Sequence, residues 1–141
     1  MAEPLITLTD DSDPAIRETI GAVLARYNDE RGGSSSSQPL SVVIRDPETS
    51  EIIGGLTGRT SRGLLFIDLV ALPAHLRGAG LGSRILRMAE DEAKRRGCRA
   101  ATLYTINFQA PEFYKRHGYR AFGEVAGDPG VTRIFMKKNL I

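Results

Sequence analysis

The chain has 141 residues, which is enough for a single domain with a buried core. Its composition, with 41% hydrophobic and 26% charged residues, is that of an ordinary globular protein. The net charge is +2 and the positive and negative residues are interspersed. This pattern argues against nucleic acid as the main partner, because nucleic-acid-binding domains usually carry a basic face.

The sequence also indicates a compartment. Cys98 is the only cysteine, so an intrachain disulfide cannot form. The first residues lack the basic and apolar regions of a secretory signal. The longest apolar stretch, residues 64–74, is too short for a membrane span and is interrupted by Asp68. We therefore expect a cytoplasmic protein without a membrane partner.

The first expected element is a short strand over Leu5–Thr9. Residues 10–14 then supply aspartate and serine oxygens for a helix cap and a proline suited to a first helical turn. Apolar residues follow at the spacing of one helical face, namely Ile16, Ile20, Val23, Leu24 and Tyr27. The glycines, serines and proline of residues 31–39 predict a mobile loop after this helix.

Three strands are expected next, over Leu40–Arg45, Glu51–Thr60 and Leu64–Ala71. Residues 46–50 form the turn between the first two of these strands. The pair Gly54-Gly55 predicts a bulge or a close backbone approach within the second strand. The third strand is almost entirely apolar, as expected of a central strand that is covered on both faces.

A second amphipathic helix is expected to begin at Leu81, with basic residues in its last turn and Gly97 after its end. The remaining elements are a strand, a short helix and two closing strands, over Ala100–Thr105, Pro111–His117, Tyr119–Val125 and Val131–Lys138. The order β-α-β-β-β-α-β-α-β-β predicts a single-domain α/β fold over residues 1–141, with helices against one mixed sheet.

The most informative segment is the glycine-rich loop of residues 77–82, which joins the apolar strand to the second helix. The first turn of a helix presents N–H groups without intrahelical partners, and glycines let this backbone approach an anion closely. The segment therefore suits a pyrophosphate, and Arg77 adds a cation. The alternative is that the glycines only allow tight packing of helix on strand. The segment is neither a Walker A loop nor a dinucleotide fingerprint.

Two motifs resemble those of the GNAT-type N-acetyltransferase superfamily. Arg77-x-x-Gly80-x-Gly82 after an apolar strand is similar to its acyl-CoA pyrophosphate motif. The segment 107–119, in which Asn-x-x-Ala precedes a helix that carries Tyr114 and ends at Gly-Tyr, is similar to its late motif. The resemblance covers about residues 40 to 138.

Residues 108–114 and 132–138 look like a bacterial subgroup of these enzymes that acts on small molecules. That subgroup often carries aromatic and histidine residues in the segment before the last strand. Residues 126–131 lack them, so the resemblance leaves the acceptor open.

The resemblance implies a mostly antiparallel sheet and an acyl-CoA donor, above all acetyl-CoA, with no metal. The donor is expected to contact the end of the third strand and the glycine loop, through Leu69, Val70, Ala71, Arg77, Gly78, Ala79, Gly80, Leu81, Gly82 and Ser83. Backbone N–H groups of residues 69–71 would polarise the thioester carbonyl. Asn107 would hydrogen-bond the pantetheine arm, and Tyr114 would protonate, or hydrogen-bond to, the sulfur of the departing coenzyme A.

Acyl transfer to an amine also needs a base, because a lysine-like amine has a pKa of about 10.4 and is protonated at pH 7. Asp68 is the candidate, since it is the one charge in the apolar strand; the alternative is a solvated or ion-paired residue. We expect His75 at the surface of a loop and Cys98 in the core. For Tyr114 the alternative is a ring packed in the core, and for Asn107 it is a loop or helix cap.

The sequence thus predicts an N-acetyltransferase acting on an amine of a small molecule or a peptide. Two alternatives stay open at this point: a catalytically silent acyl-CoA-binding module, and a nucleotide-binding protein that uses the glycine loop for ATP. A homodimer is expected only by analogy with the superfamily.

Overall fold

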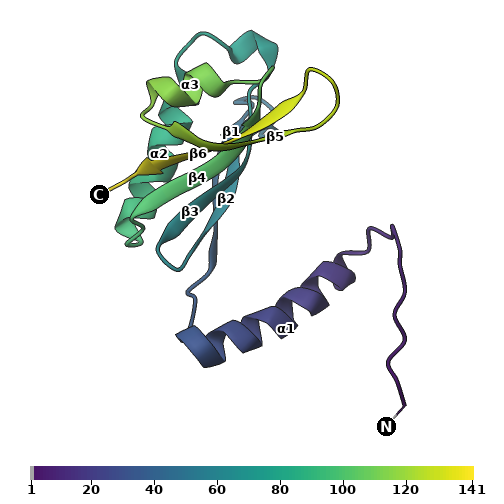
Figure 1. Ribbon diagram of the computed structural model, residues 1–141. Helices are drawn as coiled ribbons and strands as arrows, with labels where there is room; N and C mark the ends of the chain where they lie inside the picture. Colours follow the sequence, from purple (N-terminus) through teal and green to yellow (C-terminus); the bar gives the residue numbers. More distant parts are fainter. Residues whose placement is uncertain (1) are drawn as a thin grey trace. The chain divides into compact units, whose positions relative to one another are not determined.

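The computed structural model describes residues 2–141 and divides them into two compact units, residues 2–35 and Ser36–Ile141 (Figure 1). The first unit contains helix α1 (Pro14–Gly32), which begins where the sequence predicts. Its cap is Asp13, whose carboxylate accepts a hydrogen bond of 3.0 Å from the Ala15 N–H.

The strand predicted over Leu5–Thr9 is wrong, because residues 2–13 form no helix or strand. A strand needs a neighbour to satisfy its backbone groups, and within this unit no second strand is described. Side chains form hydrogen bonds with nearby backbone N–H groups instead. Thr9 Oγ1 accepts from the Asp11 N–H at 3.0 Å, and Asp11 Oδ1 accepts from the Asp13 N–H at 2.9 Å.

The second unit is built on a six-stranded sheet with the strand order β1-β2-β3-β4-β6-β5. Its elements are β1 (Gln38–Arg45), β2 (Ile52–Ser61), β3 (Leu64–Ala71), the 3₁₀ helix η1 (Ala74–Leu76), α2 (Leu81–Arg95), β4 (Ala100–Ile106), α3 (Pro111–Arg116), β5 (Arg120–Ala126) and β6 (Thr132–Asn139). All neighbouring strands are antiparallel except β3 and β4, which are parallel. The predicted mixed, mostly antiparallel sheet is therefore confirmed.

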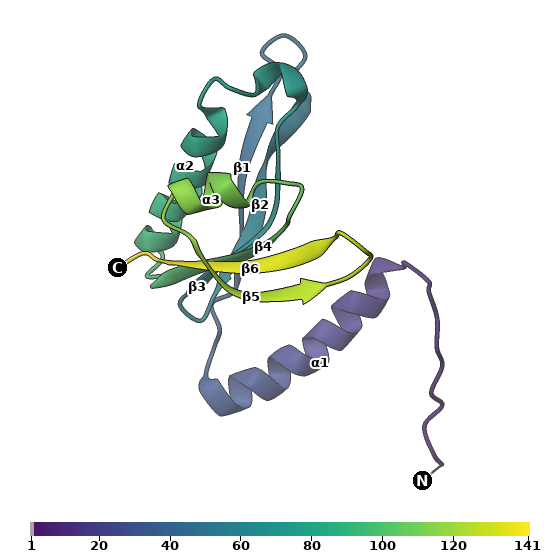
Figure 2. The ribbon, with the colours of Figure 1, turned by 45° about the horizontal axis from the view of Figure 1, so that its top comes forward.

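Strands β3 and β4 pair over only part of their length. Their register runs from Leu64 opposite Ala100 to Phe66 opposite Thr102 and stops there. Beyond that point β3 stays paired with β2 as far as Ala71, and β4 stays paired with β6 as far as Ile106. The sheet therefore separates between β3 and β4 into a near half, β1-β2-β3, and a far half, β4-β6-β5 (Figure 2).

A bulge accompanies this separation. Ile67 pairs with Gly58 and Leu69 pairs with Thr57, so Asp68 is an extra residue in β3 without an opposite partner. The close approach predicted at Gly54 is also present, because a Cβ on Gly54 would lie 2.7 Å from the Ala71 carbonyl oxygen. Only a glycine allows β2 to follow β3 to its end.

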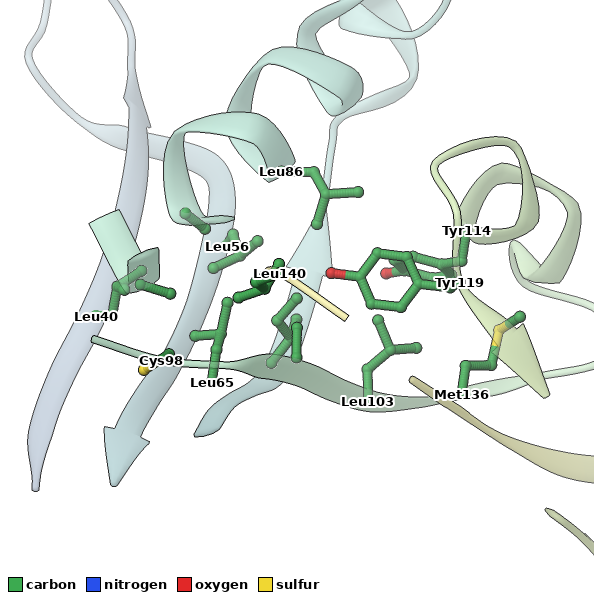
Figure 3. Close-up of a cluster of buried hydrophobic side chains, with 14 of the residues drawn as sticks. Leu40, Leu56, Leu65, Leu86, Cys98, Leu103, Tyr114, Tyr119, Met136 and Leu140 are labelled. Carbon is green, nitrogen blue, oxygen red and sulfur yellow. The ribbon is translucent and has the colours of Figure 1, made fainter. Parts of the chain in front are cut away.

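Helices α2 and α3 cover one face of the sheet and bury the core there (Figures 2 and 3). The largest fully buried side chains are Leu65, Leu86, Cys98 and Met136. Burial raises the pKa of the Cys98 thiol, so this residue acts as a small core side chain. Tyr114 and Tyr119 place their rings in the same core, 5.8 Å apart and edge to face.

One carboxylate is buried between α2 and the far half of the sheet. Glu90 of α2 accepts a hydrogen bond of 2.8 Å from the Tyr119 hydroxyl and another of 2.8 Å from Lys138 Nζ of β6. Both carboxylate oxygens are thereby paired, which is what allows a charge at this depth.

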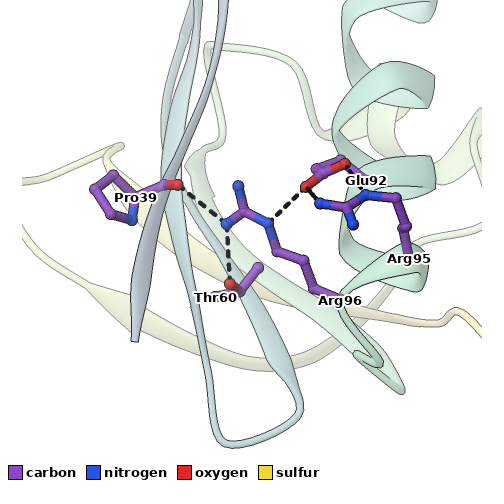
Figure 4. A network of polar contacts seen from close by, with 5 residues as sticks. All are labelled: Pro39, Thr60, Glu92, Arg95 and Arg96. Atoms are coloured by element: carbon purple, nitrogen blue, oxygen red, sulfur yellow. Dashed lines mark hydrogen bonds and ion pairs between the residues drawn. The ribbon is translucent and has the colours of Figure 1, made fainter. Parts of the chain in front are cut away.

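The end of α2 is fixed to the near half of the sheet by Arg96 (Figure 4). Its guanidinium donates to the Pro39 carbonyl of β1 at 3.0 Å and to Thr60 Oγ1 of β2 at 3.1 Å. It also pairs with Glu92 at 2.7 Å, and Arg95 pairs with the same carboxylate at 2.6 Å. The basic end of the helix is therefore partly a structural contact and not only a solvated face.

Replacing Tyr119 by phenylalanine should destabilise the protein by about 1–3 kcal/mol, because one oxygen of buried Glu90 loses its donor. Burial, and then the charge of Glu90, raise the pKa of Tyr119. The wild type should therefore lose stability as the pH rises above about 10, and Tyr119→Phe should lose less. Urea unfolding at pH 7 and pH 10.5 measures both effects, with Tyr104→Phe as the control. Equal stability of wild type and Tyr119→Phe at pH 7 would contradict this role.

Hydrogen bonds from Arg95, and then from Arg96, lower the pKa of Glu92 from its ordinary value of 4.5 to about 2. The bound carboxylate thus stabilises the fold above pH 4.5, and this contribution is lost as the pH falls from 4.5 to about 2. Glu92→Gln should be less stable than the wild type at pH 7, and the difference should shrink at pH 2.5. Denaturant midpoints at both pH values test this expectation, and a difference that does not change with pH would contradict it.

Candidate functional site

A cavity of about 830 Å³ opens where β3 and β4 separate. Its walls come from the second half of β3, the glycine loop, the first turn of α2, the second half of β4 and helix α3. Segments that are far apart in the sequence therefore meet at the gap in the sheet.

The β3 wall offers backbone groups. Residues 69–71 are paired with β2 along one edge of the strand, and the other edge has no neighbouring strand beyond Phe66. Backbone N–H and C=O groups along this edge have no ladder partner and need one from solvent or a ligand. Leu69, Val70 and Ala71 all line the cavity.

The glycine loop and the first turn of α2 form the second wall. Gly78 and Gly80 have φ angles of 84° and 79°, in the left-handed region that glycine tolerates best. The first bond of the helix runs from the Arg84 N–H to the Gly80 carbonyl at 3.1 Å. The N–H groups of residues 81–83 precede it and have no intrahelical partner, so this turn is suited to an anion.

Gly82 has a packing role beside that electrostatic one. A Cβ on Gly82 would lie 3.3 Å from the ring of Phe113 and 3.5 Å from Leu72 Cδ1. The missing side chain therefore lets α3 approach the start of α2. This packing role does not exclude the predicted anion site at the N–H groups of residues 81–83.

Tyr114 is a largely buried tyrosine in the wall of the cavity. The residue is 7% exposed, and its ring packs edge to face on Phe113 at 5.2 Å. Within residues 2–141 its hydroxyl has no hydrogen-bond partner. Every fully buried side-chain oxygen in that range has a partner, so the Tyr114 hydroxyl is not fully buried. Tyr114 lines the cavity, and we infer that its hydroxyl is accessible from there. Burial raises the pKa of Tyr114, which keeps the hydroxyl protonated at neutral pH.

Asp68, the candidate base, and His75, which we expected at the surface, lie in different surroundings. Asp68 is the bulged residue of β3, is exposed, and lines the cavity. His75 is exposed in η1 and does not line the cavity. The bulge explains how a charged residue in an apolar strand reaches the site.

Most residues predicted to contact the donor lie together around this cavity, and two do not line it. Ala79 lies between the two lining glycines. Asn107 instead joins the β5–β6 hairpin: its Nδ2 donates to the Gly130 carbonyl at 3.0 Å, and its Oδ1 accepts from the Thr132 N–H at 2.9 Å. Its neighbours Phe108 and Gln109 line the cavity. The predicted contacts of Ala79 and Asn107 with the donor stay predictions.

The structure also brings in His117, Tyr104 and Arg133, which the sequence did not single out as site residues. Nε2 of His117 lies 2.9 Å from Oγ of the predicted contact Ser83, and the His117 ring packs at a tilt on Phe113, with the ring centroids 4.8 Å apart. Arg133 of β6 and Tyr104 of β4 line the cavity from two neighbouring strands of the sheet. No short-range sequence pattern predicts either pair, because the two residues of each pair come from segments that are far apart in the sequence and meet only in the fold.

Within residues 2–141, no group of three or more histidine, cysteine, aspartate or glutamate side chains is placed to hold a metal ion. Over the same range, no helix has both the length and the apolar character needed to cross a membrane.

Comparison with known proteins identifies the family of the chain. The model of the Acetyltransferase (GNAT) family matches residues 6–119. The chain is 37% identical over 118 residues to acetyltransferase Atu2258 of Agrobacterium fabrum, covering 84% of this chain and 85% of that protein. It is 35% identical over 140 residues to blasticidin-S acetyltransferase of Streptomyces morookaense, covering 96% of each.

The fold is shared as well. A crystal structure of a protein from Agrobacterium tumefaciens superposes with a TM-score of 0.89 at 33% identity, covering 96% of this chain and 99% of that one. The resemblance inferred from the two sequence motifs is confirmed. The chain belongs to the GNAT family, and it is an acetyltransferase.

Proposed function

We propose that the enzyme transfers the acetyl group of acetyl-CoA directly to an amine of a small molecule or a peptide. One observation carries this proposal: the open edge of β3, the start of α2 and the Tyr114 hydroxyl surround a single cavity. Acetyl transfer from acetyl-CoA requires three groups. The open edge of β3 would polarise the thioester carbonyl, the start of α2 would bind the pyrophosphate, and the Tyr114 hydroxyl would donate to the leaving sulfur.

The residues of the cavity fit acetyl-CoA in a definite order. The pyrophosphate would lie at the N–H groups of residues 81–83, near Arg77, whose Nε is held by the Leu72 carbonyl at 3.2 Å. The acetyl carbonyl would accept hydrogen bonds from the open edge of residues 69–71. The sulfur would lie near the Tyr114 hydroxyl.

The reaction then needs no covalent enzyme intermediate. The neutral amine nitrogen attacks the carbonyl carbon, the C–S bond breaks, and coenzyme A leaves as a thiolate. The nitrogen loses one proton, for which Asp68 is our proposed acceptor, and the sulfur gains one. Tyr114 donates a hydrogen bond or its proton to that sulfur. If it gives its proton, the proton held by Asp68 returns through solvent to Tyr114, so one proton moves in total from amine to thiol.

The acceptor is not named by the family. One relative is named for blasticidin S, so blasticidin S belongs in an acceptor screen beside simple amines and peptides. A cytoplasmic location and a homodimer also stay proposals. The silent acyl-CoA-binding alternative requires binding without thiol release in such a screen, and the nucleotide alternative requires ATP to bind where acetyl-CoA does not.

Acetyl-CoA at 100 times its dissociation constant should add about 2.7 kcal/mol to the stability of the wild type, which is a rise of several degrees in Tm. Gly80→Glu should lose this shift, because it places a negative charge at the anion-binding turn, where a Cβ meets no atom within 4 Å. Differential scanning fluorimetry measures it. Gly63→Glu is the matched control, since Gly63 also has a positive φ, of 83°, and open space around its Cβ, but lies in the β2–β3 turn.

The control should keep the full shift. A shift that survives in Gly80→Glu, or a wild type that ATP stabilises and acetyl-CoA does not, would contradict the proposed donor site.

Tyr114→Phe should lower kcat by about tenfold to a hundredfold and leave the KM for acetyl-CoA within a few-fold, because the hydroxyl acts on the leaving sulfur. Release of free thiol with the best amine of the screen measures both constants. Tyr119→Phe is the control, since it removes a neighbouring tyrosine hydroxyl that bonds Glu90 outside the cavity. Unchanged kcat in Tyr114→Phe would exclude Tyr114 from the chemistry.

A further inference from the structure

We infer that Arg133, stacked on Tyr104, selects the acceptor, and that the preferred acceptor is an amine that also carries a carboxylate. This rests on the proposed function, because it concerns the second substrate of the same reaction. It goes beyond it by naming the chemical class of that substrate and the residue that recognises it.

The two residues lie on the sheet face opposite the helices. Along β4, Leu103 and Thr105 are buried in the core under α2 and α3, so Tyr104 between them faces the other way. Along β6, Met136 is buried and Ile134 packs against the same core, so Arg133 likewise faces away from the helices. Both residues nevertheless line the cavity that the glycine loop lines.

The cavity therefore reaches both faces of the sheet through the gap between β3 and β4. The glycine loop and α2 offer the anion-binding turn on the helix side. The side of Tyr104 and Arg133 is then left for the acceptor, so that donor and acceptor meet at the open edge of β3. The other lining arginines, Arg77 and Arg116, come from the glycine loop and from α3 and belong to the helix side.

Arg133 is placed to bind a planar anion. Its guanidinium carbon lies 5.4 Å from the centroid of the Tyr104 ring, and that ring packs on Phe135 at 5.7 Å. Within residues 2–141, no carboxylate forms an ion pair with Arg133. Stacking uses the face of a guanidinium and leaves its N–H groups available at the edge, where a carboxylate binds through two parallel hydrogen bonds.

Asp68 completes the recognition from the opposite side of the gap. Its carboxylate belongs to β3 and lines the same cavity, where it favours the positively charged form of an amine before that amine loses its proton. A substrate with an ammonium group toward Asp68 and a carboxylate toward Arg133 matches both charges. A plain amine satisfies only one of them.

A second stacked arginine provides a matched control. The guanidinium carbon of Arg59 in β2 lies 4.2 Å from the centroid of the Phe66 ring, and Phe66 is the residue opposite Arg59 in β3. Neither residue lines the cavity. Arg59→Gln and Arg133→Gln thus remove the same group from the same kind of stack.

The test uses matched pairs of amines, β-alanine with β-alaninamide and γ-aminobutyrate with γ-aminobutyramide, each with acetyl-CoA and thiol release as the readout. In the wild type the kcat/KM of each acid should exceed that of its amide by about tenfold or more. Arg133→Gln should bring this ratio close to one and leave the KM for acetyl-CoA unchanged. Arg133→Lys should restore part of the ratio, and Arg59→Gln should keep all of it.

Amides that react as well as the acids, or a ratio that Arg133→Gln does not alter, would overturn the inference while the proposed acetyl transfer stands. Turnover of neither member of any pair would overturn it as well. The Tm shift with acetyl-CoA then shows separately whether the donor site, and with it the proposed function, survives.

Discussion

The separation of β3 from β4 after Phe66 and Thr102 is the constraint on which the rest of the site depends. Two strands that run parallel and stay hydrogen-bonded would leave neither a cavity nor free backbone groups. Here the bulge at Asp68 and the pairing of β3 with β2 hold the strand end on the near half of the sheet. In the free protein, solvent can satisfy the open edge of residues 69–71, and a ligand that supplies hydrogen-bond acceptors can take its place. A thioester carbonyl is such a ligand.

Helix α2 holds the two diverging halves together. Through Arg96 its end is bonded to β1 and β2, and through Glu90 its middle is bonded to Tyr119 and to Lys138 of β6. The helix thus bridges the gap, and its first turn lies at the cavity that the gap creates. The same element therefore supplies stability and the N–H groups that we propose bind the pyrophosphate. Tyr114 packs on the ring of Tyr119, so the position of the proposed proton donor depends on this ring contact.

The sequence predicted the local parts of this arrangement well. Strand β3 was expected over its observed bounds, and the glycine loop, α2 and the helix of Tyr114 follow patterns of short range. The strand expected over Leu5–Thr9 is absent, because alternation in a short segment says nothing about whether a partner strand exists. Two features of the site were beyond local patterns: the bulge at Asp68 depends on the register with β2, and the pairing of Arg133 with Tyr104 depends on β6 lying beside β4. Asn107 shows that a motif alone does not establish a contact. Its motif predicts a hydrogen bond to the donor, whereas its side-chain amide forms hydrogen bonds with the β5–β6 hairpin in the structure.

Backbone hydrogen exchange tests the central claim most directly, because the claim concerns N–H groups that have no partner in the free enzyme. Exchange should be measured residue by residue across β3, with and without acetyl-CoA and in the absence of any acceptor. Our account predicts that amides of residues 68–71 which face the gap exchange quickly in the free enzyme and become protected by acetyl-CoA. Residues 64–66 are paired with both β2 and β4, so the exchange of their amides should change little. Protection of residues 68–71 before the ligand is added, or no change there while the glycine loop responds, would contradict the open strand edge as the place where the acetyl group binds.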